Sequence, residues 1–345
     1  MRRVVIDRPG GHDRLRVVTA PDLVPAPDRV LIDVDAVGVN YADCVVRMGL
    51  YASANRMVGF PITPGFEVAG RVRAVEPGPH GLVPGDRVMG LTLFDAYASQ
   101  ILLPPERVMA IPPGMSTIEA ATFPAVWVTA WFALELAAPP PGSDVLVHSA
   151  AGGVGSALVH LARLAGCRVV GVVGAPHKVE AARAAGAEVV IDKSSEALWP
   201  AAEAAAPGRF HAVLDANGVS TLMQSYRHLA PTGRLVVYGF HGMLPRRGGR
   251  PNRLRLLWDW LRTPRFDPLR MTTSNRSVMA FNLSFLAHEG DRLRIGLEHV
   301  VGLYRDGRIP ALPVTTYPFE SVARAHADLE SGRTVGKLAL VLDRE

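Results

Sequence analysis

The chain has 345 residues, more than one typical domain, so we expect two domains with a ligand-binding cleft between them. Hydrophobic residues make up 48% and charged residues 20%, which excludes a disordered or fibrous protein. The net charge of +5 is concentrated between residues 246 and 270, where eight arginines face two aspartates, so it does not indicate nucleic-acid binding.

The first hundred residues contain β-branched runs, such as 30–34 and 68–75, that glycine and proline interrupt. This pattern predicts a β-barrel-like first domain, to which we assign residues 1–117. Its amino terminus has no apolar stretch followed by small residues, and no window of the chain is apolar enough to cross a bilayer. We therefore expect a cytoplasmic protein.

The two cysteines, Cys44 and Cys167, cannot form a disulfide framework or a four-thiolate zinc site. We expect both to be small buried hydrophobic residues. Such residues suit a reducing compartment.

A stretch rich in Ala, Trp and Leu predicts one helix over 118–137, and three prolines end it. Apolar runs with helical patterns between them follow, which predicts a doubly wound parallel sheet covered on both faces. We assign residues 118–285 to this Rossmann-type domain. Its predicted strands are 145–148, 169–173, 189–191, 212–214 and 235–238.

The last part of the chain mixes short helical and extended patterns, after the nucleotide-binding sheet is complete. We expect residues 286–345 to return to the first domain. The predicted helices are 295–304 and 322–329, and the predicted strands are 313–317 and 337–342.

The segment from Ala150 to Gly155, Ala-Ala-Gly-Gly-Val-Gly, follows the first predicted strand of this sheet and opens an amphipathic helix. In a dinucleotide fingerprint Gly152 lets the backbone approach the pyrophosphate, and Gly155 lets the helix pack on the strand. Gly153 and Val154 add unpaired N–H groups at the helix start. The alternative is a tight turn without a cofactor.

The end of the next strand decides between NADH and NADPH. Proteins that prefer NAD have an acidic residue there for the ribose hydroxyl, whereas this chain has Gly174 and then Lys178. Lys193, after the third strand, could also attract a 2′-phosphate. The sequence therefore favours NADPH, although both lysines could be solvated surface charges.

Several short motifs follow one another along the chain. They are Gly-Val-Asn-Tyr-Ala-Asp (38–43), Gly-Leu-Tyr (49–51), Pro-Gly-Phe-Glu-Val-Ala-Gly (64–70), Pro-Gly-Asp-Arg-Val (84–88) and the glycine-rich turn. The chain thus resembles the quinone oxidoreductases of the medium-chain dehydrogenase/reductase superfamily. Asn-Arg-Ser-Val (275–278), with Phe281 and a long insert before it, is similar to the synaptic vesicle amine transport protein group.

This resemblance implies a GroES-like β-barrel catalytic domain, a Rossmann domain, and NADPH between them. Zinc alcohol dehydrogenases of the superfamily carry a cysteine at the position of Asn40 and a histidine at that of Phe66. Losing two ligands removes the metal that would polarise an alcohol. The resemblance therefore implies a zinc-independent reductase that transfers hydride to the C=C bond of a quinone, an enone or another α,β-unsaturated carbonyl.

On the same resemblance, Asn40 donates an N–H to the substrate oxygen, and Tyr51 bonds that oxygen or relays a proton. Thr129 lies near the nicotinamide amide, and the backbone of Gly239 and Phe240 lies beside the cofactor. Plainer alternatives remain: Asn40 could only cap a helix, and Tyr51 could only be a cleft-wall aromatic. We expect Asp43 and Glu67 to be structural hydrogen-bond acceptors, and His148, His160 and His241 not to be ligands.

A basic segment at 245–270 has Leu254, Leu257, Trp258 and Leu261 at helical spacing, with Trp260 beside them. It could lie on an anionic membrane surface or cover a hydrophobic substrate. We favour the alternative that its apolar stripe packs on its own Rossmann domain or on a dimer partner. The run 278–283 predicts an edge strand, which the resemblance implies pairs with its copy in a homodimer.

Two functions remain open. The first is the NADPH-dependent reductase of a small apolar carbonyl or quinone. The second is an NADPH-binding, membrane- or partner-associated protein in which catalysis is minor.

Overall fold

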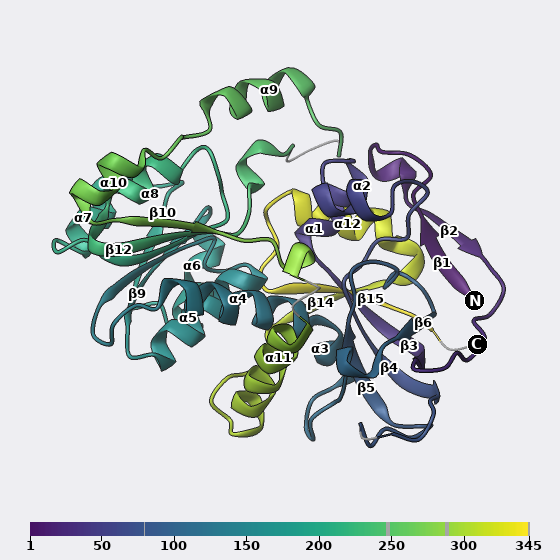
Figure 1. Ribbon diagram of the computed structural model, residues 1–345. Coiled ribbons are helices and arrows are strands. Elements are labelled where there is room, and N and C mark those ends of the chain that lie inside the picture. Colours follow the sequence, from purple (N-terminus) through teal and green to yellow (C-terminus); the bar gives the residue numbers. More distant parts are fainter. Residues whose placement is uncertain (79, 246–248, 287–289, 344–345) are drawn as a thin grey trace. The chain divides into compact units, whose positions relative to one another are not determined.

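Figure 1 shows the computed structural model, which describes residues 1–345 except 79, 246–248, 287–289 and 344–345. The chain forms two compact units. Unit 1 comprises Met1–Val126, Pro245–Arg250 and Ser284–Glu345, and unit 2 comprises Trp127–Leu244 and Pro251–Leu283. The predicted combination of a β-barrel-like part and a doubly wound parallel sheet is confirmed. The predicted domain limits stay a proposal, because contacts alone define these units.

Unit 1 is built on a mixed sheet with the order β14-β15-β3-β4-β5-β7, in which β6 pairs with β3 and every pair except β14-β15 is antiparallel. A separate hairpin-like pair joins β1 and β2. The strands are β1 (Arg2–Val5), β2 (Arg16–Thr19), β3 (Val30–Val39), β4 (Glu67–Ala74), β5 (Arg87–Leu91), β6 (Gln100–Leu103), β7 (Val108–Ala110), β14 (Val314–Pro318) and β15 (Lys337–Val341).

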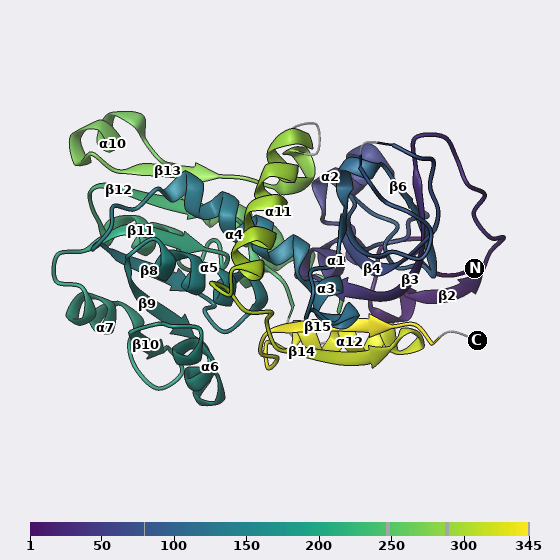
Figure 2. The same cartoon turned by 90° about the horizontal axis from the view of Figure 1, so that it is seen from below.

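The strand β15 lies between β3, to which it is antiparallel, and β14, to which it is parallel. Residues from the end of the sequence therefore complete a sheet that begins near its start. Figure 2 shows α12 alongside β14 and β15. Val322 and Ala325 of α12 join the core that Val37 and Val68 of the sheet form, and each such buried valine contributes about 1.5–3 kcal/mol.

Short helices lie between the strands of unit 1, and its longest helix begins after the chain has returned from unit 2. The helices are α1 (Tyr41–Arg47), α2 (Ala52–Met57), α3 (Thr117–Thr122), α11 (Gly290–Arg305) and α12 (Val322–Glu330).

Unit 2 has a fully parallel sheet with the order β10-β9-β8-β11-β12-β13, the doubly wound order of dinucleotide-binding folds. The strands are β8 (Asp144–His148), β9 (Arg168–Val173), β10 (Val189–Asp192), β11 (Phe210–Asp215), β12 (Leu229–Val237) and β13 (Ser277–Ala280). The helices are α4 (Pro124–Ala137), α5 (Gly153–Leu164), α6 (Val179–Ala184), α7 (Leu198–Ala205), α8 (Leu222–Arg227), α9 (Arg253–Arg262) and α10 (Pro268–Ser274), with α4 starting in unit 1.

Four predicted elements differ clearly from the observed ones, and one of them, the helix predicted over 295–304, begins five residues earlier, at Gly290. The single helix predicted over 118–137 is wrong, because Pro124 lacks an N–H and separates α3 from α4. The predicted strand at 235–238 starts earlier, at Leu229. The strand predicted at 278–283 lies at the sheet edge as expected, but it ends at Ala280, and a 3-10 turn begins at Leu283.

The apolar stripe of α9 does not pack on its own Rossmann unit, so the alternative that we favoured for it is wrong in this respect. Leu254 is 80% exposed and Trp260 is 62% exposed, and Leu257, Trp258 and Leu261 are exposed as well. The half-buried residues of α9 are Leu256 and Asp259. Arg246 and Arg247 of the basic segment lie outside the described residues. No helix in the described part of the chain combines the length and apolarity of a membrane span.

Candidate functional site

The glycine-rich turn lies between β8 and α5, as predicted. Gly152 stands just before the helix, and a Cβ on Gly155 would lie 2.1 Å from the carbonyl oxygen of Ser149, which excludes any side chain at position 155. The N–H groups of the first helical turn have no acceptor within α5, and the helix dipole makes this end positive. The turn therefore fits a dinucleotide pyrophosphate.

The other predicted cofactor residues belong to unit 2 as well. Gly174 follows β9 and is exposed, and a Cβ there would lie 3.6 Å from the Cε of Lys193, so this lysine lies beside the strand end. Lys178 is half-buried at the start of α6, and Thr129 is half-buried on α4.

Gly239 and Phe240 follow β12 directly. Parallel strands place their carboxyl ends at one edge of the sheet, so Gly174 and Gly239 share the edge that carries the glycine-rich turn. Phe240 is 44% exposed and packs on Gly218, where a Cβ would lie 2.6 Å from its ring. This leaves one face of the ring open at that edge.

A buried hydrogen-bonded group at the same edge was not found from the sequence. Ser225 donates to Asp215 at 2.9 Å, and its oxygen lies 3.1 Å from the Nε2 of His148. Asp215 also accepts the N–H groups of Asn217 and Gly218, so it shapes the turn after β11. Ser225, His148 and Asp215 have no solvent exposure, which indicates a structural brace rather than a hydrolytic site.

Asn40 is part of a tightly bonded cluster in unit 1. Its Nδ2 donates to the Oε1 of Glu67 at 2.8 Å, and its Oδ1 accepts from the Nζ of Lys337 at 2.6 Å. Lys337 also bonds the Oε1 of Glu67 at 2.9 Å and the carbonyl of Val39 at 3.1 Å, and Glu67 accepts the N–H of Ala125. Asn40 stands directly before α1, but its side-chain hydrogen bonds join it to Glu67 and Lys337.

The expectation that Glu67 is a structural acceptor is therefore confirmed, whereas Lys337 was missed. A signal for it exists in the sequence, since Lys337 is the one charged residue in the otherwise apolar run 337–342. A charged residue at a strand position needs a partner when it is buried. The sequence alone does not say which residue that partner is.

Tyr51 stands directly before α2 and is half-buried. Its hydroxyl lies 2.9 Å from the Oγ of Ser284, and either oxygen can donate. Its ring meets Phe66 edge-on, with 5.6 Å between the centroids. One contact therefore supports a polar role for Tyr51, and another supports a packing role.

Asp43 is also an acceptor, as expected, and it links Asn40 to a second buried network. Its Oδ2 accepts the backbone N–H of Asn40 at 2.7 Å and the hydroxyl of Tyr97 at 3.0 Å. Burial is the main cause that raises the pKa of Asp43, to about 7. The oxygen of Tyr97 lies 3.2 Å from the Nε2 of His326, and burial holds the pKa of His326 well below its usual value.

Beyond His326 the network reaches a buried ion pair. Arg47 bonds the Oε1 of Glu330 at 2.6 Å and lies 3.3 Å from the Nδ1 of His326, while the Nε2 of His12 lies 2.9 Å from the other oxygen of Glu330. Cys44 lies 3.5 Å from the same Nδ1. Both cysteines are buried and free, but Cys44 contacts polar groups and is not simply a hydrophobic residue.

Among the described residues, Cys44, His326 and Glu330 form the one group whose donor atoms are close enough to hold a metal ion. The guanidinium of Arg47 already bonds Glu330 and contacts His326, so a second cation there would meet a fixed positive charge. Burial raises the pKa of the Cys44 thiol, which further disfavours a thiolate ligand. The group suits an internal hydrogen-bond network better than a metal.

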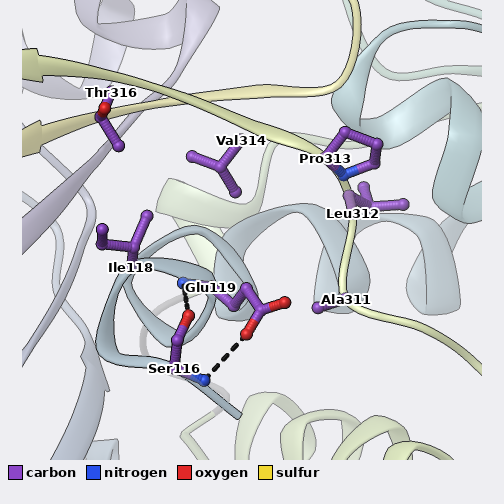
Figure 3. A pocket seen from close by; sticks show the side chains of 8 residues that line it. All are labelled: Ser116, Ile118, Glu119, Ala311, Leu312, Pro313, Val314 and Thr316. Carbon is purple, nitrogen blue, oxygen red and sulfur yellow. Dashed lines mark hydrogen bonds between the residues drawn. The ribbon is translucent and has the colours of Figure 1, made fainter.

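A surface hollow of about 540 Å³ lies in unit 1, between the start of α3 and the segment that leads into β14. Figure 3 shows the side chains that line it. The carboxylate of Glu119 turns back to the N–H of Ser116 and caps α3. None of the lining residues belongs to the Asn40 cluster or to the glycine-rich turn. We therefore assign the hollow no part in the site.

Comparisons with known proteins agree with this arrangement. Residues 153–257 match the zinc-binding dehydrogenase family, and residues 26–113 match the alcohol dehydrogenase GroES-like domain. The chain is 32% identical over 344 residues to the synaptic vesicle membrane protein VAT-1 homolog of Homo sapiens, across 99% of this chain and 86% of that protein.

Two solved structures have the same fold over nearly the whole chain. The Escherichia coli quinone oxidoreductase complexed with NADPH has a TM-score of 0.84 and 25% identity, and the match covers 99% of this chain and 100% of that one. The CurK enoyl reductase has a TM-score of 0.83 and 26% identity, with 99% of each chain covered.

Proposed function

Because this chain belongs to the medium-chain dehydrogenase/reductase superfamily, we propose that it is an NADPH-dependent, metal-free reductase. It transfers hydride to the C=C bond of a quinone, an enone or a related α,β-unsaturated carbonyl that is small and apolar. The observation that carries the metal-free part is the Asn40 cluster. Asn40 stands where the zinc enzymes carry a ligand cysteine, and the ammonium of Lys337 bonds both Asn40 and Glu67, so a cation of the protein's own lies at this position.

The cofactor preference rests on the edge of the parallel sheet. The N–H groups of Gly153, Val154 and Gly155 would hold the pyrophosphate, with Ala150 and Gly152 shaping the turn. Lys178 and Lys193 would attract the 2′-phosphate beside Gly174, where an acidic residue is lacking. Thr129, Gly239 and Phe240 would contact the nicotinamide end.

NADPH, when bound, supplies the hydride, and the protein's part is to bind the substrate oxygen on which negative charge develops. An asparagine amide has two N–H groups, and Glu67 takes one of those of Asn40. The other N–H meets no acceptor among the residues that the structure describes, so we assign it to the substrate oxygen. Tyr51, together with Ser284, would hold the same oxygen or relay a proton to the product.

The test is a panel of quinones, enones and enoyl thioesters assayed for NADPH oxidation, with NADH in parallel and metal analysis of the purified protein. We expect turnover of at least one acceptor with NADPH, weaker activity with NADH, and no stoichiometric zinc. Absence of binding to either nicotinamide dinucleotide, or activity that follows zinc content, would contradict the proposal.

The substitution Gly152→Ala tests the proposed cofactor site. The added Cβ would lie 3.3 Å from the oxygen of Ser149 and meet no other atom, so the fold should tolerate it. It would occupy the approach of the pyrophosphate, and we expect NADPH to bind about tenfold or more weakly. Calorimetric titration measures the dissociation constant, and an unchanged constant would count against this binding mode.

A second candidate function rests on α9 alone. Its exposed Leu254, Trp258 and Leu261 lie on one face, and Arg253, Arg255 and Arg262 flank them. Trp and Leu beside arginines suit the headgroup region of an anionic membrane. We therefore also propose surface binding to anionic lipid, measured by co-sedimentation with vesicles that contain or lack phosphatidylserine; equal retention on neutral vesicles would reject it.

A homodimer through the edge strand β13 remains part of the proposal. The strand lies at the open edge of the parallel sheet, where a second copy could add its own strand. Sedimentation velocity of the purified protein would measure the oligomeric state.

A further inference from the structure

Lys337 is a buried lysine whose hydrogen-bonding capacity is fully used. Only 4% of the residue is exposed, and its Nζ bonds three oxygens, those of Val39, Asn40 and Glu67, at 2.6–3.1 Å. An ammonium has three N–H groups, so each of them has an acceptor. A buried charge persists only when it is paired and bonded in this way.

These bonds fix which way the Asn40 amide points. Its oxygen faces the ammonium of Lys337, and its nitrogen faces the carboxylate of Glu67. Turning the amide over would place the oxygen against the carboxylate and the NH₂ group against the ammonium. Both contacts would be repulsive in a site with little water to screen them. The two charged partners therefore admit one orientation, which aims the second N–H away from Glu67.

The contact with Lys337 also strengthens the donor. A positive charge 2.6 Å from an amide oxygen draws electron density toward that oxygen and makes the remaining N–H more positive. Glu67 balances the charge of Lys337, so the site gains a stronger donor without a net charge that would need hydration.

The rarity of lysine in this chain supports a specific role for Lys337. Of 37 basic residues, only Lys178, Lys193 and Lys337 are lysines, and all others are arginines. A planar guanidinium presents its donors as a fork, whereas three acceptors around one nitrogen suit a compact ammonium. The cluster is also closely packed on one side, since a Cβ on Gly38 would lie 2.3 Å from the Oε1 of Glu67.

We propose that Lys337 is a positioning residue, which orients the Asn40 amide and strengthens the N–H that it offers to the substrate oxygen. This inference rests on the proposed function, because it takes Asn40 to be the group that contacts the substrate. Lys337 itself touches no substrate.

The first experiment is a double-mutant cycle on the turnover of the best acceptor. We expect Lys337→Met to lower kcat by about tenfold or more, with the NADPH dissociation constant unchanged. In an Asn40→Ala background the same substitution should change kcat less than about twofold, because its effect passes through Asn40. Equal losses in both backgrounds would overturn the proposal. Arg73→Met, which removes an exposed cation of unit 1, is the matched control.

Lys337→Met leaves Glu67 buried without its charged partner and could prevent folding. The double substitution Lys337→Met with Glu67→Gln removes both charges, and the glutamine oxygen at position 67 can still accept from Asn40, although Ala125, which bonds the other carboxylate oxygen, loses its acceptor. It should fold and show the same loss of kcat. Full activity of a folded double variant would overturn the proposal, and so would rescue of kcat by Lys337→Arg, because the guanidinium does not fit the three acceptors.

A readout that needs no turnover separates this inference from the proposed function. With ¹⁵N-labelled asparagine, the side-chain signals of Asn40 are assigned by their loss in Asn40→Ala. We expect both N–H signals of the wild type to be shifted from the positions of an exposed asparagine side chain, and to move toward those positions once Lys337 and Glu67 are neutralised. Unchanged signals would overturn the positioning role even in an active enzyme. A wild type that reduces no acceptor but shows the expected signals would overturn only the proposed function.

Discussion

Asp43 is a carboxyl group without solvent contact, and its titration has a calculable effect on stability. Burial raises its pKa to about 7, above the ordinary value near 4. As the pH rises between these values, the unfolded chain releases the proton and the folded chain keeps it. The folded state therefore loses stability over this range, and above pH 7 the effect is constant.

We predict that the difference in unfolding free energy between the wild type and Asp43→Asn falls by about 1 kcal/mol per pH unit between pH 4 and 7. Asparagine can still accept from Asn40 and Tyr97, so the comparison isolates the charge. Urea unfolding at pH 5, 6, 7 and 8 measures it. A difference that stays flat below pH 7 would show that Asp43 titrates normally.

His326 acts in the opposite sense. Its folded-state pKa is depressed by burial, so its contribution is present above its ordinary pKa and is lost as the pH falls toward the folded value. In the wild type the slopes of His326 and Asp43 oppose each other just below the ordinary pKa of His326. Only the comparison with a variant can separate them.

Arg47 gives a second prediction, because it has no solvent exposure and pairs with Glu330. Arg47→Met should destabilise the protein by about 3–5 kcal/mol, since it leaves Glu330 without its charged partner. The double variant Arg47→Met with Glu330→Gln should recover part of that loss. Urea unfolding of both variants tests this, and a double variant no more stable than the single one would contradict it.

The sequence indicated Asn40 and Glu67 as residues of the site, but it did not indicate Lys337, which bonds both of them. Their motifs are local, and residues 38–43 and 64–70 are recognisable as they stand. Lys337 lies 297 residues from Asn40. The pairing depends on the register of β15 against β3, in which Leu338 faces Val39, and no local pattern specifies that register.

The elements of unit 2 were predicted well because their signals are strong and local. Buried parallel strands are apolar runs, and the turn between β8 and α5 carries its glycines in sequence. The break at Pro124 was missed because the apolar residues on either side of it continue one helical pattern. A helical pattern does not show whether a proline inside it bends the helix or divides it.

The stripe of α9 illustrates a different limit. Its spacing was predicted, but periodicity shows only that a helix has an apolar face and not which way that face turns. Leu257 and Leu261 turn outward, whereas an ordinary surface helix buries such residues. Packing within the chain therefore cannot account for these residues.

A prediction follows for α9. Replacing Leu254, Leu257 and Leu261 together by serine should change the unfolding free energy by less than about 1 kcal/mol, because these side chains are already in water. Leu158→Ser, inside α5, should cost several kcal/mol, because that side chain is fully buried. Thermal unfolding of both variants tests the contrast, and a large loss for the α9 variant would mean that the stripe is buried in the native protein.

At the scale of the whole molecule, the two units differ in how the chain builds them. Unit 2 is almost continuous in sequence, and all six strands of its sheet lie between residues 144 and 280. Unit 1 combines three separate stretches, and β14 and β15 come from the last of these. Strands from both ends of the sequence therefore complete unit 1, whereas the strand pairs of unit 2 all lie within residues 144–280.

We predict that a fragment of residues 124–283 folds alone and binds NADPH, whereas residues 1–126 alone do not fold. The first keeps every strand of its sheet, while the second lacks β14, β15 and the charge partner of Glu67. Circular dichroism and calorimetric titration of each fragment measure this. A folded 1–126 fragment would show that β15 is dispensable.

The position of β15 has a consequence during protein synthesis. A ribosome releases the parallel sheet some sixty residues before it releases Lys337, and domains generally fold as they emerge. The nucleotide-binding part can therefore form while the sheet of unit 1 still lacks β14 and β15. Asn40, made among the first residues, acquires its final orientation among the last, so a nascent chain can bind a dinucleotide before it can act on a substrate.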